Sequence, residues 1–176
     1  MRKNKSEIYL AIFIILVIAA TAFLYMQTQE KSSTVIFPEK MGDMNLTLYR
    51  DGEIAMSAVK QLHGNNPLVK IESAYIADYR STSTNKAKFW VSESKTSENA
   101  ASLLVFMNSG VGKTGMFSDS TPMTIEGVTV YFVTGQPELG LYHYFYAKDK
   151  RLFWIQVDNP DEVYRLNFVK ESIKRI

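Results

Sequence analysis

One apolar run near the N-terminus constrains this chain more than any other feature. It extends from Ile8 to Met26, and Thr21 is its only clearly polar residue. A helix of that length, at about 1.5 Å rise per residue, covers ~28 Å, close to the hydrocarbon thickness of a bilayer. The sequence therefore predicts a single transmembrane helix over residues 8–26, with the lipid bilayer as its first partner.

The charges that flank this run predict its orientation. Arg2, Lys3 and Lys5 precede it, and no excess of basic residues follows it. Because cytoplasmic flanks of membrane helices carry the excess of lysine and arginine, residues 1–7 are expected in the cytoplasm. Everything after the run is then extracytoplasmic, which makes the chain a single-pass membrane protein with an uncleaved signal-anchor.

The alternative is a cleaved signal peptide. Residues 20–22 (Ala-Thr-Ala) have the small side chains of a cleavage site, and cleavage after Ala22 would give a secreted protein. We favour the anchor because the apolar character continues from Phe23 to Met26 and completes a membrane-spanning length.

The remaining charge pattern excludes several classes of partner. The chain has 20 basic and 18 acidic residues, but three basic residues and one acidic residue precede the apolar run. The part after it is therefore neutral, which argues against a nucleic-acid partner. Since there is no cysteine, disulfides and thiolate metal ligands are excluded, and we expect no cofactor.

After a polar tether at residues 27–34, residues 35–176 are expected to form one α+β domain. Apolar residues recur at helical spacing in three stretches, which begin near Asp51, at Thr96 or Ser97, and near Asn159. Asn159 is the expected cap of the last helix. The expected buried stripes are Ala55, Ala58, Val59 and Leu62; Ala100, Leu103, Leu104 and Met107; and Val163, Leu166, Val169 and Ile173.

Between these helices the sequence predicts a mainly antiparallel sheet of six or seven strands. The expected strands are residues 45–49, 69–79, 87–92, 128–134, 141–147 and 152–157, with a short one at 121–126. Short turns between consecutive strands indicate antiparallel pairing with the three helices on one face. The first part has the β-α-β-β-α-β order of a ferredoxin-like unit.

Residues 110–115 (GVGKTG) only partly match a phosphate-binding loop. Such a loop needs another glycine five residues before the Gly-Lys pair, where this chain has Met107. It also runs from a strand into a helix, whereas this segment follows a predicted helix. A flexible glycine-rich connection is the better interpretation.

The two histidines do not form a recognisable catalytic or metal-binding motif. His63 lies in the last turn of the first predicted helix, where an imidazolium can meet the helix's free carbonyls, and His143 lies among tyrosines. No His-x-x-x-His spacing occurs, so no metal site is predicted. A hydrolase-like enzyme that uses one of these histidines stays as an alternative.

The aromatic hairpin at residues 141–157 supplies the other binding candidates. Tyr142, Tyr144 and Tyr146 share one strand face, and Trp154 lies on the next strand. A three-residue loop would pair Tyr144 with Trp154 and create a common tyrosine–tryptophan surface. A two-residue Asp149-Lys150 turn would instead pair Tyr144 with Ile155 and Phe145 with Trp154.

The chain resembles uncharacterised prokaryotic single-pass proteins with an extracytoplasmic α+β domain. The matching segments are Phe37-Pro38, residues 52–53 and 62–64, residues 74–79, residues 89–93, and the hairpin strands at 143–146 and 153–155. This resemblance implies a common small fold and no activity.

We therefore expect a membrane-tethered binding or accessory domain, such as a small subunit of a membrane complex with a protein partner. A carrier or sensor for an apolar ligand is the further alternative, and it predicts an internal cavity.

Overall fold

The computed structural model describes residues 35–63 and 70–176. The predicted membrane helix and tether lie outside the described residues. Within the described ranges, no helix has the length and apolarity needed to cross a membrane. The chain divides into two compact units, and the second, Val35–Ile176, is the domain considered below.

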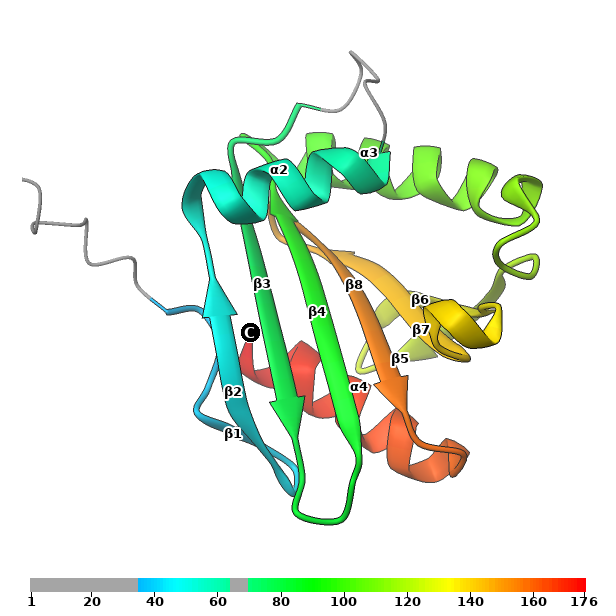
Figure 1. Ribbon diagram of the computed structural model, residues 1–176. Helices are drawn as coiled ribbons and strands as arrows, with labels where there is room; N and C mark the ends of the chain where they lie inside the picture. The colour runs from blue at the N-terminus through cyan, green and yellow to red at the C-terminus, as the bar shows by residue number, and fades with distance from the viewer. Residues whose placement is uncertain (1–34, 64–69) are drawn as a thin grey trace, which may run out of the picture. The chain divides into compact units, whose positions relative to one another are not determined.

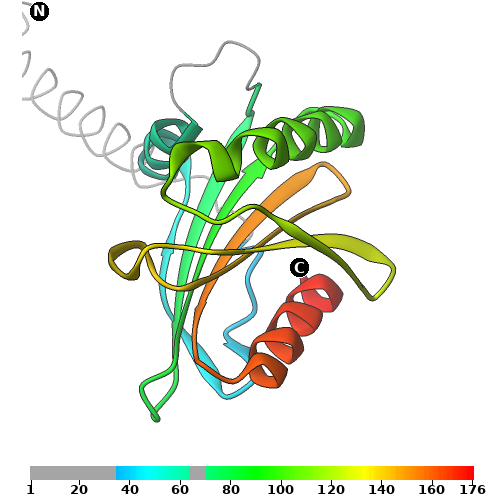
Figure 2. The ribbon, with the colours of Figure 1, turned by 90° about the vertical axis from the view of Figure 1, so that its right-hand side faces the viewer.

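In the described part of the chain, eight strands form one antiparallel sheet (Figure 1). Their order across it is β1-β2-β3-β4-β8-β7-β6-β5. The strands are β1 (Lys40–Met41), β2 (Met44–Arg50), β3 (Ser73–Arg80), β4 (Lys86–Glu93), β5 (Thr121–Ile125), β6 (Val128–Thr134), β7 (Tyr142–Lys148) and β8 (Arg151–Asp158). The sheet is strongly twisted, so that β6 and β7 run across the direction of β3 and β4 (Figure 2).

The predicted α+β class and antiparallel pairing are confirmed, and β1 is the strand that the sequence did not reveal. It has two residues, too few for a periodic signal, and pairs with the start of β2 across a tight turn at Gly42. The β-α-β-β-α-β order is present along the chain. However, the strands do not pair as in a ferredoxin-like unit, because the sheet consists of two meanders, β1 to β4 and β5 to β8, that are joined where β4 pairs with β8.

The helices cover both faces of the sheet, not one face as the sequence suggested. α2 (Gly52–His63) and α3 (Ser97–Gly110) pack on one face, and α4 (Glu162–Arg175) packs on the other (Figure 2). The central strands explain the difference. In β4, Phe89 and Val91 point toward α4 while Trp90 points toward α2, so both faces are apolar and both need cover.

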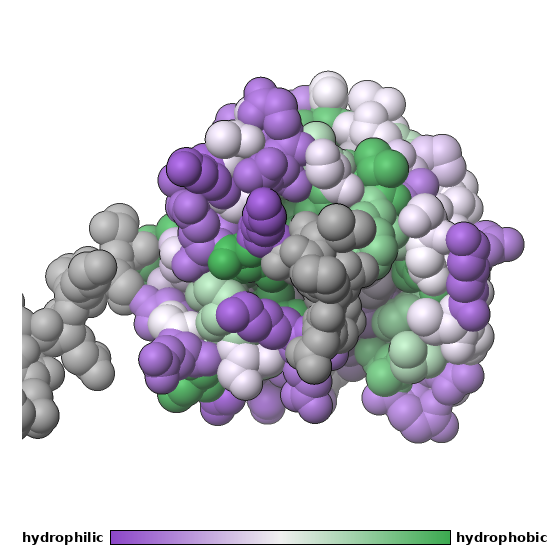
Figure 3. Space-filling model, turned by 90° about the horizontal axis from the view of Figure 1, so that it is seen from above, coloured by the Kyte–Doolittle hydropathy of each residue, from purple (hydrophilic) through white to green (hydrophobic). Residues whose placement is uncertain are grey.

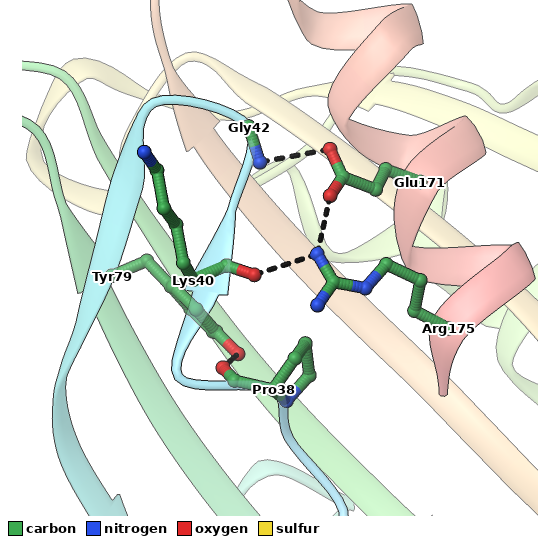
Figure 4. Close-up of polar contacts among 6 residues, drawn as sticks. All are labelled: Pro38, Lys40, Gly42, Tyr79, Glu171 and Arg175. Atoms are coloured by element: carbon green, nitrogen blue, oxygen red, sulfur yellow. Dashed lines mark hydrogen bonds and ion pairs between the residues drawn. The ribbon is translucent and has the colours of Figure 1, made fainter.

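The larger core lies between the sheet and α4. Phe168 of α4 meets the rings of Tyr79 and Phe89 at centroid distances of 6.1 and 5.8 Å. Tyr79 is fully buried, and its hydroxyl donates a hydrogen bond to the Pro38 carbonyl at 2.7 Å (Figure 4). The start of the domain is thereby fixed to this core.

The predicted cap of α4 is wrong, and its predicted buried stripe is confirmed only at Val169 and Ile173. Asp161, not Asn159, caps the helix, because its carboxylate accepts from the backbone N–H of Val163 at 2.9 Å. Val163 is 66% exposed, and the buried face contains Arg165 and Ser172. A stripe of apolar residues alone could not reveal a face that includes two hydrogen-bonded polar side chains.

Hydrogen bonds also join the C-terminal end of α4 to the β1–β2 turn (Figure 4). The Gly42 N–H donates to Glu171 Oε2 at 2.8 Å. Arg175 donates to the Lys40 carbonyl at 2.7 Å and to Glu171 Oε1 at 2.6 Å. We call the set Lys40, Gly42, Glu171 and Arg175 the β1–α4 clasp.

Candidate ligand-binding cavity

A cavity of about 550 Å³ lies on the sheet face that α2 and α3 cover. Strands β4, β8 and β7 form its floor, and α3 with Val59 of α2 forms its roof. Two short helical turns, η1 (Val111–Thr114) and η2 (Pro137–Leu139), line its sides. Its volume is within the range of pockets that hold small molecules.

The central row of the floor is aromatic and is formed by Trp90 and Trp154, with Phe145 packed beside them. Trp90 of β4 pairs with Trp154 of β8, which pairs with Phe145 of β7, so the three side chains project from the same sheet face. The Trp154 and Phe145 rings are stacked at 5.1 Å with an interplanar angle of 10°. Phe117 meets Trp154 edge-on at 5.2 Å. These contacts give the floor a fixed shape.

The neighbouring row of the floor is polar. Lys88 pairs with Gln156, and Gln156 pairs with His143, so the three lie side by side on β4, β8 and β7. All three line the cavity. The floor therefore has an aromatic part and a polar end, an arrangement that fixes the orientation of ligands in many binding sites.

Apolar side chains surround the opening. Phe106 of α3, Met116 after η1 and Leu139 of η2 line the cavity and are 39%, 46% and 38% exposed. Figure 3 looks down on α2 and α3 and shows hydrophobic atoms exposed among polar ones on this side. An apolar ligand could contact these side chains before it reaches the floor.

His143 is held by two hydrogen bonds in the polar row. The Trp154 indole N–H donates to His143 Nδ1 at 3.0 Å, and His143 Nε2 lies 2.9 Å from the Gly140 carbonyl. Because an indole N–H can only donate, Nδ1 must be unprotonated and Nε2 must carry the hydrogen. Burial lowers the pKa of His143, which favours the same neutral form.

This arrangement makes His143 a support for Trp154. Both ring nitrogens are engaged, so the imidazole could act as a base or bind a metal only after one bond is broken. Gly135 lies close behind the ring, and a β-carbon there would be 3.1 Å from Nε2. The packing around His143 therefore favours one orientation of its imidazole ring.

The sequence-predicted candidates are divided between the two sheet faces. Tyr144 and Tyr146 are buried beneath α4, and the Arg165 guanidinium lies 3.8 Å above the Tyr142 ring. His143 and Trp154 lie on the opposite face, in the cavity. His63 ends α2, and its side chain is outside the described part.

The hairpin register explains this division. Tyr144 pairs with Ile155, and Phe145 pairs with Trp154, as expected for the two-residue Asp149-Lys150 turn. The common tyrosine–tryptophan surface belongs to the other register and is not formed. Burial raises the pKa of Tyr144 despite the neighbouring Arg165, so this tyrosine is a neutral core residue.

Several cavity residues were not identified from the sequence. The segment at residues 110–115 forms the end of α3 and the helical turn η1, and Val111 and Thr114 line the cavity. The glycines and the lysine of this segment indicated a flexible connection and gave no signal for this place in the cavity wall. Trp90 had a usable signal, because it alternates with Phe89 and Val91 and so had to face the other side of the sheet.

Across residues 35–63 and 70–176, no group of three or more histidine, aspartate or glutamate side chains is arranged to hold a metal ion. Comparison of the whole chain with protein-family models, curated proteins and solved structures finds no match in any of the three.

Proposed function

We propose that this protein is a non-catalytic binding protein that holds a small, mainly apolar ligand outside the cytoplasm. The cavity over Trp90 and Trp154 carries this proposal. Two tryptophans form the centre of its floor, Lys88, Gln156 and His143 lie together at one end of that floor, and apolar side chains line much of its opening. These are the properties of a preformed site for a small molecule.

The hydrolase alternative has less support. His143, which lines the cavity, is engaged through both ring nitrogens by Trp154 and Gly140. A general base needs one nitrogen directed at the proton it removes. Binding requires no such freedom, because the same bonds keep Trp154 in place.

Intrinsic fluorescence offers a direct test, because both tryptophans of the chain line the cavity. N-phenyl-1-naphthylamine is a neutral apolar probe that accepts energy from tryptophan. We expect saturable energy transfer to this probe in the full chain, held in a non-ionic detergent. Absence of saturable transfer would contradict the proposed function.

A matched pair of variants distinguishes binding of the probe in the cavity from its uptake by the detergent micelle. Ser92 is buried on the cavity floor, so Ser92→Met places an unbranched side chain in the cavity. We expect this substitution to weaken probe binding at least about fivefold, since the methionine side chain occupies space in the cavity that the probe would need. Ser57→Met makes the same change on the exposed surface of α2 and should leave binding unchanged.

The location of the domain is the second part of the proposal. We propose that residues 8–26 anchor the chain, with residues 35–176 outside the cytoplasm. Alkaline extraction of membranes should leave the full-length protein in the lipid fraction, because a spanning helix is not released by breaking ionic contacts. Recovery of a shortened protein in the soluble fraction would support cleavage after Ala22 instead.

A further inference from the structure

The polar end of the cavity contains two side-chain donors at adjacent positions. Lys88 and Gln156 are directly paired on β4 and β8 and line the cavity together. Side chains at paired positions of an antiparallel ladder start about 5 Å apart. The Lys88 ammonium and the Gln156 amide can therefore reach one group on a ligand.

Lys88 is not engaged in a close ion pair. Among the described residues its ion partner is Asp78, with Nζ 3.9 Å from Oδ1, whereas Lys150 lies 2.8 Å from Glu93. The Lys88 side chain is 41% exposed, and its ammonium lies 5.0 Å from the Trp90 ring centre. The cation is thus at the boundary between the aromatic floor and solvent.

The Gln156 amide is also available. In the described ranges the structure gives its side chain no hydrogen-bond partner, although the main chain is fully paired within the sheet. Gly140 lies directly against this amide, and a β-carbon there would clash with it. The amide is therefore kept within the cavity by packing.

Two carboxylates oppose this interpretation. Asp78 is paired with Lys88 across β3 and β4, with Oδ1 3.9 Å from Nζ, but it does not line the cavity. Glu138 does line the cavity, but it belongs to the exposed turn η2 at the opening. There its charge is screened by water, whereas Lys88 stands on the floor beside a second donor. The charge arrangement on the floor consequently favours an anion.

We infer that the ligand is an amphipathic acid whose apolar body lies over Trp90 and Trp154 and whose anionic head meets Lys88 and Gln156. This inference rests on the proposed function. A head at the partly exposed Lys88 keeps some of its hydration, so the cavity does not have to bury a full charge. The charge-assisted bonds then fix which end enters first.

Two probes with the same ring system test the role of Lys88. 1-Anilinonaphthalene-8-sulfonate carries a sulfonate that N-phenyl-1-naphthylamine lacks. In the full chain we expect Lys88→Met to weaken binding of the sulfonate at least about fivefold and to change binding of the neutral amine less than twofold. Lys88→Arg keeps the positive charge and should retain most of the sulfonate affinity.

Lys86→Met is the matched control, because Lys86 lies on the same strand two residues away, is exposed and does not line the cavity. Lys86→Met should change the affinity for neither probe.

Equal effects of Lys88→Met on both probes, or no effect on either, would overturn the inference of an amphipathic acid but leave the proposed binding cavity. Tighter binding of a cationic naphthalene than of the sulfonate would also overturn it and would assign the head site to Glu138. Failure of both probes in the unaltered protein would instead reject the proposed function itself.

Discussion

At the scale of single residues, the bond between Trp154 and His143 determines the chemistry of the histidine. The indole N–H requires an unprotonated Nδ1, and burial opposes the imidazolium for the same reason that it opposes any charge. Protonation of His143 would therefore break the bond that holds Trp154 in the cavity floor. A histidine that looked like a candidate for proton transfer is thus a structural support.

The folded-state pKa of His143 lies below its usual value of 6.5, so the unfolded chain binds a proton more readily than the folded chain. This group's contribution to stability is fully present above about pH 6.5 and decreases as the pH falls toward the folded-state pKa. We expect the free energy of unfolding, measured with urea, to fall between pH 7 and pH 5. His143→Gln should remove that fall, whereas His63→Gln should retain it. An identical pH dependence in the His143→Gln protein would show that other groups cause it.

The sequence identified His143 and Trp154 but could not bring them together. Whether Tyr144 or Phe145 faces Trp154 depends on a one-residue difference in the turn, and both turns were compatible with residues 148–150. The positive φ of 52° at Asp149 belongs to the observed two-residue turn. The register of this turn determines which aromatic residues share a face, because a one-residue shift moves every side chain to the other side of the sheet.

At the scale of elements, the turn η2 is connected to β7 through Gly140, which has a backbone conformation that almost no residue except glycine adopts. Its φ is 88° and its ψ is 145°, a region in which a β-carbon is strained, and Gln156 occupies the space that a side chain would need. We expect Gly140→Ala to lower the free energy of unfolding by at least about 1–3 kcal/mol. It should also weaken sulfonate binding, because the clash displaces the Gln156 amide.

Gly110→Ala is the control for this prediction. Gly110 also lines the cavity, but its φ is −111° and a β-carbon there meets no atom within 4 Å. We expect its stability to stay within about 0.5 kcal/mol of the unaltered protein in the same urea titration. Equal losses in the two variants would mean that the strained backbone of Gly140 is not the cause.

Helix positions and the faces of α2 and α3 were predictable from local signals, since Ala55, Val59, Ala100 and Leu103 are buried as expected, whereas the face of α4 was only partly predictable. Thr96, one of the two caps that the sequence allowed for α3, accepts a hydrogen bond from the Asn99 N–H. The buried face of α4, in contrast, is set by the partners of Arg165 and Ser172, which are Tyr144 and Tyr146 on a strand about twenty residues earlier. Such partners are known only once the sheet is assembled.

At the scale of the whole domain, one sheet separates two structures with different roles. The α4 face contains the main core and the β1–α4 clasp, while the α2/α3 face contains the cavity. Residues of β4 and β8 alternate between the two, so each strand contributes to both. The sequence predicted the antiparallel α+β class because turns and periodicity are local. The cavity was not predictable, since it arises from three strands and two helices that meet only in the fold.

This separation predicts that the clasp can be weakened without loss of binding. Glu171→Ala removes the acceptor of the Gly42 N–H and the partner of Arg175. We expect faster amide hydrogen exchange at residues 40–42 and a decrease of about 1 kcal/mol or less in the free energy of unfolding, because the Glu171 and Arg175 side chains are partly exposed to solvent. Glu162→Ala, in the first turn of the same helix, should not change amide exchange at residues 40–42.

The affinity for N-phenyl-1-naphthylamine should be unchanged in both variants, since the cavity is formed on the other face of the sheet. A drop in affinity in Glu171→Ala alone would show instead that α4 and the cavity are coupled through the strands they share.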